Sequence, residues 1–351
     1  MKVHLHPVDE AGCGYYRMKE PCRAARLYGV DAEIHETFKI VSDAEGQTKA
    51  LPTEADVIVM QRPVKHRYIN RVEEFQAMGV AVVIEIDDDL SALHPQHVSR
   101  EFMEGRREGD ADVHWRVTAK LAAMADMVTV TSEALAERFA PHGRAAVIPN
   151  CVPAALLEEP RLSNGHTVGW TGAINYHPGD LEITSGGVQG ALEGTDWEFL
   201  KIGGGPERCQ RGLDLKHRPE STGPLPIEGY HRALGGLDIG IVPLADSRFN
   251  QAKSYLKGIE YAARGVPFVA SPVAEYERLH EMGLGLLAKD RARSWKTAIR
   301  LLMQNDEQRA EMAERGKEIV REHCTFEAQG WQWAEAWEEA VRVRQAHKAA
   351  A

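Results

Sequence analysis

Short apolar runs alternate with longer amphipathic segments along most of the chain, and this alternation predicts the fold class. The runs are continuous in apolar residues rather than alternating, which is typical of strands covered on both faces of a parallel sheet. The repeated strand–helix order predicts an α/β protein. Strands are expected over 3–5, 56–62, 80–86, 127–132, 167–172, 197–202 and 237–244.

Helical periodicity fills most of the intervals between these runs. Ser132 can accept an N-cap hydrogen bond for the helix at 133–139, and Gly79 and Gly265 stand where helices should end. The other helices are expected over 21–28, 68–78, 114–124, 228–236, 256–263, 294–303, 306–322 and 327–347.

The stretch from Arg248 to Ser271 carries the strongest candidate chemistry. A polar loop and a helix follow a buried strand, and ligands bind at such strand ends in α/β sheets. Lys253 and Lys257 are four residues apart, so one helix face near its positive N-terminus could present both to an anion. Glu260 lies on nearly the same side, where a carboxylate can hold ribose hydroxyls. A solvated charged helix face is the alternative interpretation of this pattern.

Residues 259–269, Ile-Glu-Tyr-Ala-Ala-Arg-Gly-Val-Pro-Phe-Val, resemble the nucleotide-sugar motif of retaining glycosyltransferases of the GT-B fold, the family-4-like group (glycosyl transferases group 1). That motif reads Leu-Glu-Ala-Met-Ala-x-Gly-x-Pro-Val-Val. The resemblance implies that Glu260 binds the donor ribose. The family's first glutamate, which touches the donor sugar, would fall at Ala252 and is missing. The implied donor-sugar contacts therefore do not carry over.

Other segments extend the resemblance over most of the chain. Residues 146–152, Ala-Val-Ile-Pro-Asn-Cys-Val, are similar to the end of the family's first domain, with Cys151 in place of glycine. Gly203 and Gly205 match a turn that lies beside the nucleotide base in relatives. The turn at Gly172 lacks the arginine and lysine that reach the diphosphate in the family, so Lys253 and Lys257 are expected to supply the positive charge.

The resemblance implies two Rossmann-like domains that face a cleft. We expect an acceptor-side domain over 1–152, a linker over 153–164 and a nucleotide-sugar domain over 165–326. A C-terminal helix over 327–351 is expected to pack back on the first domain. Its three tryptophans favour core packing, with a partner surface as the alternative.

In the first domain, the glycine loop over 12–17 and the acidic turn after the strand at 80–86 are the expected cleft elements. Gly12, Gly14 and Arg17 are candidate acceptor or phosphate contacts, and a tight turn is an equally good interpretation of the glycines alone. Asp87 and Asp89 are candidate acceptor contacts. An Asp-x-Asp turn also suggests a metal-dependent GT-A glycosyltransferase, in which carboxylates hold Mn²⁺. The polar segment 91–112 is expected to form a loop over the cleft.

Composition narrows the class of protein. The 351 residues carry a formal net charge of -10, which argues against a general nucleic-acid or anionic membrane surface. Five cysteines without a C-x-x-C pair favour a reducing, cytoplasmic setting. No apolar run approaches the roughly 18 residues of a membrane span. His94 and His97 have no evident third partner for a metal site.

The sequence thus predicts an enzyme that transfers a sugar from a nucleotide-diphosphate donor, UDP or GDP, with retention and without a metal or other cofactor. The acceptor stays open between a glycan, a protein, a small molecule and modified DNA, and the protein is expected to be a monomer or homodimer. A GT-B epimerase or hydrolase and a degenerate sugar-nucleotide binder are the alternatives. The predicted catalytic residues are Lys253 and Lys257, and the predicted donor-binding residues are Glu260, Gly172, Gly203, Gly205, Asn250 and Ser254.

Overall fold

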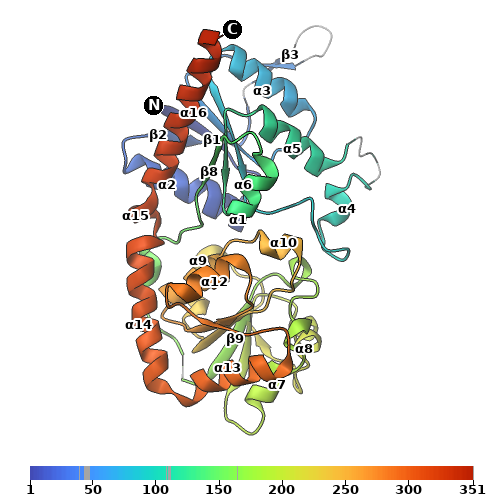
Figure 1. Cartoon of the computed structure of the whole chain (residues 1–351), viewed down its shortest axis with the longest axis vertical. Coiled ribbons are helices and arrows are strands. Elements are labelled where there is room, and N and C mark those ends of the chain that lie inside the picture. Colours follow the sequence, from blue (N-terminus) through green and yellow to red (C-terminus); the bar gives the residue numbers. More distant parts are fainter. Residues whose placement is uncertain (39, 43–47, 108, 110–111, 164, 351) are drawn as a thin grey trace.

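The computed structural model describes residues 1–38, 40–42, 48–107, 109, 112–163 and 165–350. Two α/β halves lie one above the other along the long axis of the molecule (Figure 1). Each half is built on one six-stranded sheet. We call the part around the first sheet the N-terminal half and the part around the second sheet the C-terminal half.

The first sheet is parallel throughout, with strand order β2-β1-β5-β6-β7-β8. Every residue of the three central strands is buried, as the continuous apolar runs predict. A short antiparallel pair, β3 with β4, stands apart from this sheet. The strands are β1 (Lys2–His6), β2 (Asp31–Ile34), β3 (Ile40–Ser42), β4 (Thr48–Ala50), β5 (Val57–Gln61), β6 (Ala81–Ile86), β7 (Met127–Val130) and β8 (Ala145–Val147).

Helices of the N-terminal half follow β1, β5, β6 and β7, as expected, whereas β2, β3 and β4 were not expected from the sequence. The helices are α1 (Gly12–Gly14), the π-helical turn η1 (Tyr15–Lys19), α2 (Glu20–Arg26), α3 (Arg67–Ala77), α4 (Arg100–Met103), α5 (His114–Met124) and α6 (Glu133–Phe139). The expected loop at 12–17 is wrong, because α1, η1 and α2 form one continuous helical segment. The expected loop over 91–112 contains the short helix α4, and residues 108, 110 and 111 lie outside the described part.

The second sheet repeats the design with strand order β11-β10-β9-β12-β13-β14, again all parallel. Its strands are β9 (Thr167–Thr171), β10 (Glu198–Ile202), β11 (Glu220–Ser221), β12 (Ile239–Val242), β13 (Phe268–Ala270) and β14 (Leu286–Leu287). Its helices are η3 (Ile174–Tyr176), η4 (Glu182–Thr184), α7 (Gly187–Leu192), α8 (Pro206–Gly212), α9 (Ile227–Leu234), α10 (Arg248–Gln251), α11 (Leu256–Ala263), α12 (Ala274–Glu281) and α13 (Ala292–Gln304).

The last helices run from the C-terminal half to the N-terminal half. They are α14 (Asp306–His323), α15 (Phe326–Gln329) and α16 (Trp331–Ala350). Helix α14 packs on α11, whereas α16 packs on β6, β7 and α2 (Figure 1). Trp333 and Trp337 are buried in this contact, and Trp331 is exposed. None of the described helices combines the length and the apolar content needed to span a bilayer.

The two places where the chain passes between the halves are bonded to each other. Val152 donates its backbone N–H to the carbonyl of Cys324 and accepts from the N–H of Phe326. The short helix η2 (Ala154–Leu157) follows Val152. The buried guanidinium of Arg264 donates to the carbonyls of Leu156 and Pro160, at 3.2 and 2.6 Å. The segment after Val152, where the chain first passes between the halves, is therefore bonded both to residues 324–326, where it passes back, and to Arg264 of the C-terminal half.

Candidate functional site

A cleft of about 2110 Å³ lies between the two halves. Strands of a parallel sheet end on one edge, and both sheets turn that edge toward the cleft, where ligands of α/β folds bind. Most of the predicted site residues line it. From the N-terminal half these are Gly12, Arg17 and Asp87, and from the C-terminal half Gly172, Gly203, Gly205, Lys253, Ser254, Lys257 and Glu260.

The segment from β12 to β13 lines the cleft on the side of the C-terminal half. Helix α11 ends at Ala263, and Gly265 follows with a φ of 61°, the left-handed conformation that glycine adopts without cost. The expected strand, helix, stop and strand are all present. The first turn of α11 lies at the cleft, because Leu256 and Lys257 both line it.

Lys253 and Lys257 reach the cleft by different routes. The expectation that they share a helix face is wrong, because α11 begins at Leu256 and Lys253 lies in the turn before it. The Lys253 ammonium lies 4.6 Å from the centre of the Phe249 ring and 3.4 Å from an Asp88 carboxylate oxygen of the opposite half. The two ammonium groups are still close enough for Lys253 to lower the pKa of Lys257.

A hydrogen-bonded chain holds the Lys257 ammonium in place. Asp180 accepts from Nδ1 of His177 at 2.8 Å, and Nε2 of His177 lies 3.0 Å from Nζ of Lys257. Burial lowers the pKa of His177 to about 3, with a further contribution from Lys257, so the imidazole is neutral at neutral pH. A neutral ring that donates through Nδ1 must accept through Nε2. The chain therefore orients a cationic Lys257.

Burial also lowers the pKa of Lys257, to about 8, and Lys253 adds to the effect. Among the described residues that line the cleft, Lys257 is a cation that forms no ion pair with a carboxylate in this structure. A desolvated ammonium without a counter-ion attracts an anionic ligand strongly, because the surroundings screen its charge less than water does.

Glu260 is buried and bonded to two tyrosines. Tyr230 donates to one carboxylate oxygen at 2.6 Å, and Tyr16 of the N-terminal half donates to the other in a short hydrogen bond. The Tyr16 hydroxyl also lies 2.7 Å from Nε2 of His231. Burial raises the pKa of Glu260, and the two tyrosine hydrogen bonds oppose the rise. Ribose hydroxyls could bond to this carboxylate in place of the tyrosines.

Asn250 and Ser254, both predicted to bind the donor, lie at different depths. Asn250 is buried outside the cleft lining and donates to Asp180 at 2.7 Å, so it supports the chain behind Lys257. Ser254 lines the cleft and accepts a hydrogen bond of 2.7 Å from Asn150 of the N-terminal half.

The glycine turns of the C-terminal half leave backbone at the cleft surface. Gly172 and Gly203 have φ values of 140° and 101°, which side chains rarely adopt. Beneath them the buried Lys201 donates to the carbonyl of Gly172 at 2.7 Å, and burial lowers its pKa to about 8. Gly205 is the N-cap residue of α8, and a Cβ there would lie 2.8 Å from Ile174. Contacts with Lys201 and Ile174 thus hold these turns in place.

Gly12 and Gly14 differ although they share α1. A Cβ on Gly12 would meet no atom within 4 Å, whereas one on Gly14 would collide with the Asp9 carbonyl. Gly14 therefore serves the close packing of the chain, and Gly12 lies open to the cleft.

Arg17 is buried and bound within the N-terminal half. It forms an ion pair of 2.7 Å with Glu85 of β6 and donates to Ile148 and Asn150 after β8. Because Asn150 in turn donates to Ser254, Arg17 positions the residues that meet the C-terminal half. Burial raises the pKa of Glu85, and Arg17 opposes the rise.

Each aspartate of the acidic turn after β6 pairs with a cation. Asp87 lies 3.2 Å from Arg62, Asp88 pairs with Lys253, and Asp89 lies 3.1 Å from Arg248. Asp87 lines the cleft, whereas Asp89 is buried away from the lining and joins the two halves through Arg248.

Residues 187–335 match the model of a family described as glycosyl transferase-like. This match covers most of the C-terminal half, which is therefore similar to glycosyl transferase-like proteins.

Solved structures match almost the whole chain. Sucrose-phosphate synthase from Thermosynechococcus elongatus matches with a TM-score of 0.64 at 15% identity, covering 97% of this chain and 99% of that one. HepE from Anabaena, solved with UDP and glucose, matches with a TM-score of 0.63 at 16% identity, covering 96% and 99%. A glycosyltransferase from Rickettsia africae matches with a TM-score of 0.63 at 11% identity, covering 97% and 98%. No protein of curated function matches the sequence.

The fold of this chain is GT-B, with two facing parallel sheets. The alternative of a GT-A enzyme is therefore wrong. The acidic turn that suggested it is paired with three cationic side chains.

Several side chains of the cleft escaped the sequence prediction. His177 and Asp180 are three residues apart, and this His-x-x-Asp spacing was a usable signal. Tyr16 and Tyr230 carried no local signal, because Tyr16 meets Glu260 from 244 residues away. Arg62 had no signal either, since its partner Asp87 lies on the neighbouring strand's end.

Proposed function

We propose that this protein is a retaining glycosyltransferase that uses a nucleotide-diphosphate sugar and needs no metal at the reacting centre. The observation that carries the proposal is Lys257 in the first turn of α11, with Lys253 just before this helix and Glu260 one turn further on, in the cleft of a GT-B fold. Among the described residues, no carboxylate forms an ion pair with Lys257. Cations and a helix N-terminus stabilise a departing diphosphate without a metal.

Each group has a proposed role. Lys257 and Lys253 bind the diphosphate and stabilise its charge as the glycosidic bond breaks, and Lys253 exchanges its contact with Asp88 for phosphate oxygens. Glu260 holds the ribose hydroxyls once the Tyr16 hydroxyl moves aside. The open backbone at Gly172, Gly203 and Gly205 faces the nucleotide. Gly12 and Asp87 face the acceptor from the N-terminal half.

A uridine nucleotide is the proposed donor class. HepE was solved with UDP and with UDP-glucose, and the pneumococcal O-GlcNAc transferase GtfA with UDP and GlcNAc. GtfA matches with a TM-score of 0.57 at 13% identity. These similarities support UDP over GDP, and they leave the acceptor class open.

The first test is calorimetry of UDP-, GDP-, ADP- and TDP-sugars, each with and without EDTA. We expect one UDP-sugar to bind with the same affinity in both conditions. Binding that EDTA abolishes would contradict the metal-free proposal, and a lack of binding by every donor would contradict the nucleotide-sugar assignment. The anomeric configuration of the product, measured by NMR, then tests retention.

A non-catalytic sugar-nucleotide binder is the second candidate, and one position favours it. Ala252 stands where the family's donor-sugar glutamate is expected, and it is buried, with its carbonyl bonded to Ser132. Binding of a UDP-sugar without transfer or hydrolysis over a broad acceptor panel would support this candidate. Release of free sugar without an acceptor would instead indicate a hydrolase.

A further inference from the structure

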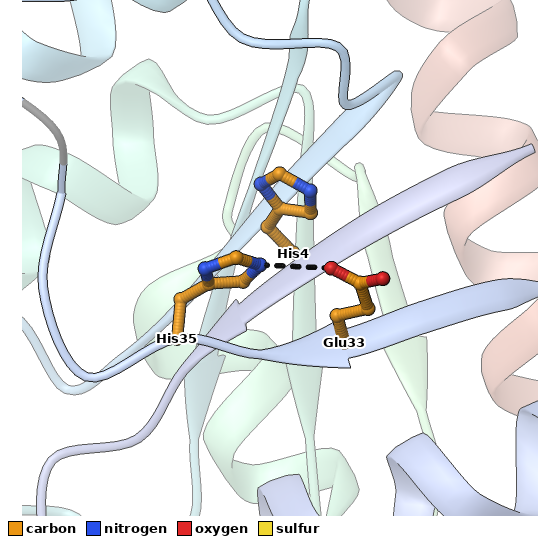
Figure 2. Close-up of side chains that lie close together, drawn as sticks. All are labelled: His4, Glu33 and His35. Carbon is orange, nitrogen blue, oxygen red and sulfur yellow. Dashed lines mark ion pairs between the residues drawn. The ribbon is translucent and has the colours of Figure 1, made fainter.

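Two histidines and a glutamate gather at the edge of the first sheet, outside the cleft lining. His4 belongs to β1, Glu33 belongs to the edge strand β2, and His35 follows directly after β2 (Figure 2). His4 and Glu33 are paired across the two strands. One possible ligand atom from each of the three side chains lies within 4.8 Å of the others.

The spacing of these atoms is close to that of a metal site. Nε2 of His35 lies 3.3 Å from a carboxylate oxygen of Glu33, and Figure 2 shows the two groups pointing at each other. Ligands of a tetrahedral zinc ion, with bonds near 2.0–2.1 Å, lie roughly 3.4 Å apart. The Glu33–His35 pair has this separation already, and the ligand atom of His4 lies within 4.8 Å of both.

Both imidazoles have a nitrogen available to a metal. Nε2 of His4 and Nε2 of His35 are buried and make no hydrogen bond to the described residues. Nδ1 of His4 lies 3.4 Å from the Thr53 hydroxyl, which places that contact on the other side of the ring. A partner at one ring nitrogen fixes the orientation of the ring for metal binding at the other nitrogen.

His6 adds a third imidazole on the same face of β1. It is 8% exposed, both of its ring nitrogens lack a hydrogen bond, and its ring centre lies 5.9 Å from that of His35.

We propose that His4, Glu33 and His35 bind one divalent transition-metal ion, with zinc as the preferred ion and water as the fourth ligand. Two imidazoles and one carboxylate form a common three-ligand zinc set. The side chain of Glu33 is 44% exposed, so solvent can reach a fourth position. The ion would join the edge strand β2 and the segment after it to β1, and it would take no part in chemistry at the cleft.

The test is calorimetric titration of ZnCl₂ into full-length protein that has been stripped of metal. We expect one site, and we expect Glu33→Gln, His35→Gln and His4→Gln each to weaken zinc binding at least about tenfold. Glu33→Gln is the safest variant for folding, because its side chain is partly exposed. Cobalt(II) bound in place of zinc should give the visible absorption of a tetrahedral site in the wild type.

His166→Gln is the matched control. His166 lies 2.8 Å from an Asp196 carboxylate, an exposed histidine–carboxylate pair that is not part of a three-ligand group in the described chain. This variant should bind zinc like the wild type. Absence of zinc uptake by the wild type, or equal affinity in wild type, Glu33→Gln and His35→Gln, would overturn the proposal. UDP-sugar binding by Glu33→Gln should be unchanged, which separates this test from that of the transferase function.

Discussion

At the scale of single residues, the Asp180–His177–Lys257 chain explains how a lysine can remain charged in a partly dry cleft. Asp180 fixes the tautomer of His177, and the ring then accepts from the ammonium rather than competing with it for a proton. Because the tautomer of His177 is fixed, its Nε2 also fixes the direction in which the Lys257 ammonium points.

Lys257→Ala and Lys253→Ala should each reduce turnover at least about tenfold, which corresponds to roughly 1.4 kcal/mol of lost transition-state stabilisation. The reason is loss of positive charge at the leaving diphosphate. Steady-state kinetics with the identified donor measures the effect. Lys289→Ala removes an exposed lysine and serves as the control. Wild-type kcat in Lys257→Ala would exclude Lys257 from the mechanism.

The pH dependence of kcat/KM for the donor should follow the lowered pKa of Lys257. The ammonium is charged below about 8 and loses its proton as the pH rises through that value, so kcat/KM for the donor should fall on the alkaline side. Lys257→Arg keeps its charge throughout this range. A profile that falls equally in wild type and Lys257→Arg would assign the titration to another group.

Glu260→Gln should weaken donor binding at least about tenfold, since a carboxylate accepts two ribose hydroxyl hydrogen bonds and an amide accepts at one atom only. Calorimetry with UDP and with 2′-deoxy-UDP separates this role from a structural one. The substitution should weaken the binding of 2′-deoxy-UDP less than that of UDP. An equal loss for both ligands would argue that Glu260 only supports the fold.

At the scale of elements, the proposed donor competes with a hydrogen bond between η1 and α11. The Tyr16 hydroxyl donates to the Glu260 carboxylate, to which the ribose is proposed to bind, so donor binding must replace this hydrogen bond. Tyr16→Phe should therefore tighten UDP binding several-fold. Tyr230→Phe, which removes the bond from within the C-terminal half, is the comparison. Weaker binding in Tyr16→Phe would place Tyr16 among the donor contacts.

The elements were predictable from the sequence to the extent that their causes are local. Continuous apolar runs predicted β5, β6 and β12, and Gly265 predicted the end of α11. The helix expected over 256–263 matches α11. Lys253 was nevertheless expected on a face of this helix, whereas it lies three residues before the first helical residue.

The position of Glu260 at the cleft was predictable from a motif, and that of Lys257 from its place near a helix N-terminus, whereas the roles of both residues stay predictions. It was not predictable where burial and partners decide a role. Arg17 was expected at a ligand, yet its ion pair with Glu85 depends on a strand 68 residues away. Charged residues of this kind can be assigned only when the tertiary contacts are known.

At the scale of the whole molecule, helix α16 joins the end of the described chain to the first sheet. Trp337→Ala should lower the free energy of unfolding by about 3–5 kcal/mol, because a large buried side chain is removed from this contact. Trp331→Ala should change it by only about 0.5 kcal/mol, since Trp331 is 46% exposed. Chemical denaturation followed by circular dichroism measures both. Similar losses in the two variants would contradict the packing role.

The position of α16 also has a consequence for biosynthesis. A ribosome makes the strands of the N-terminal half first, but it makes the helix that covers β6 and β7 only after the entire C-terminal half. Domains generally fold as they emerge, so the nascent N-terminal half must wait with part of one sheet face, over β6 and β7, uncovered. Chaperone binding to stalled nascent chains should therefore persist until residues 331–350 leave the exit tunnel.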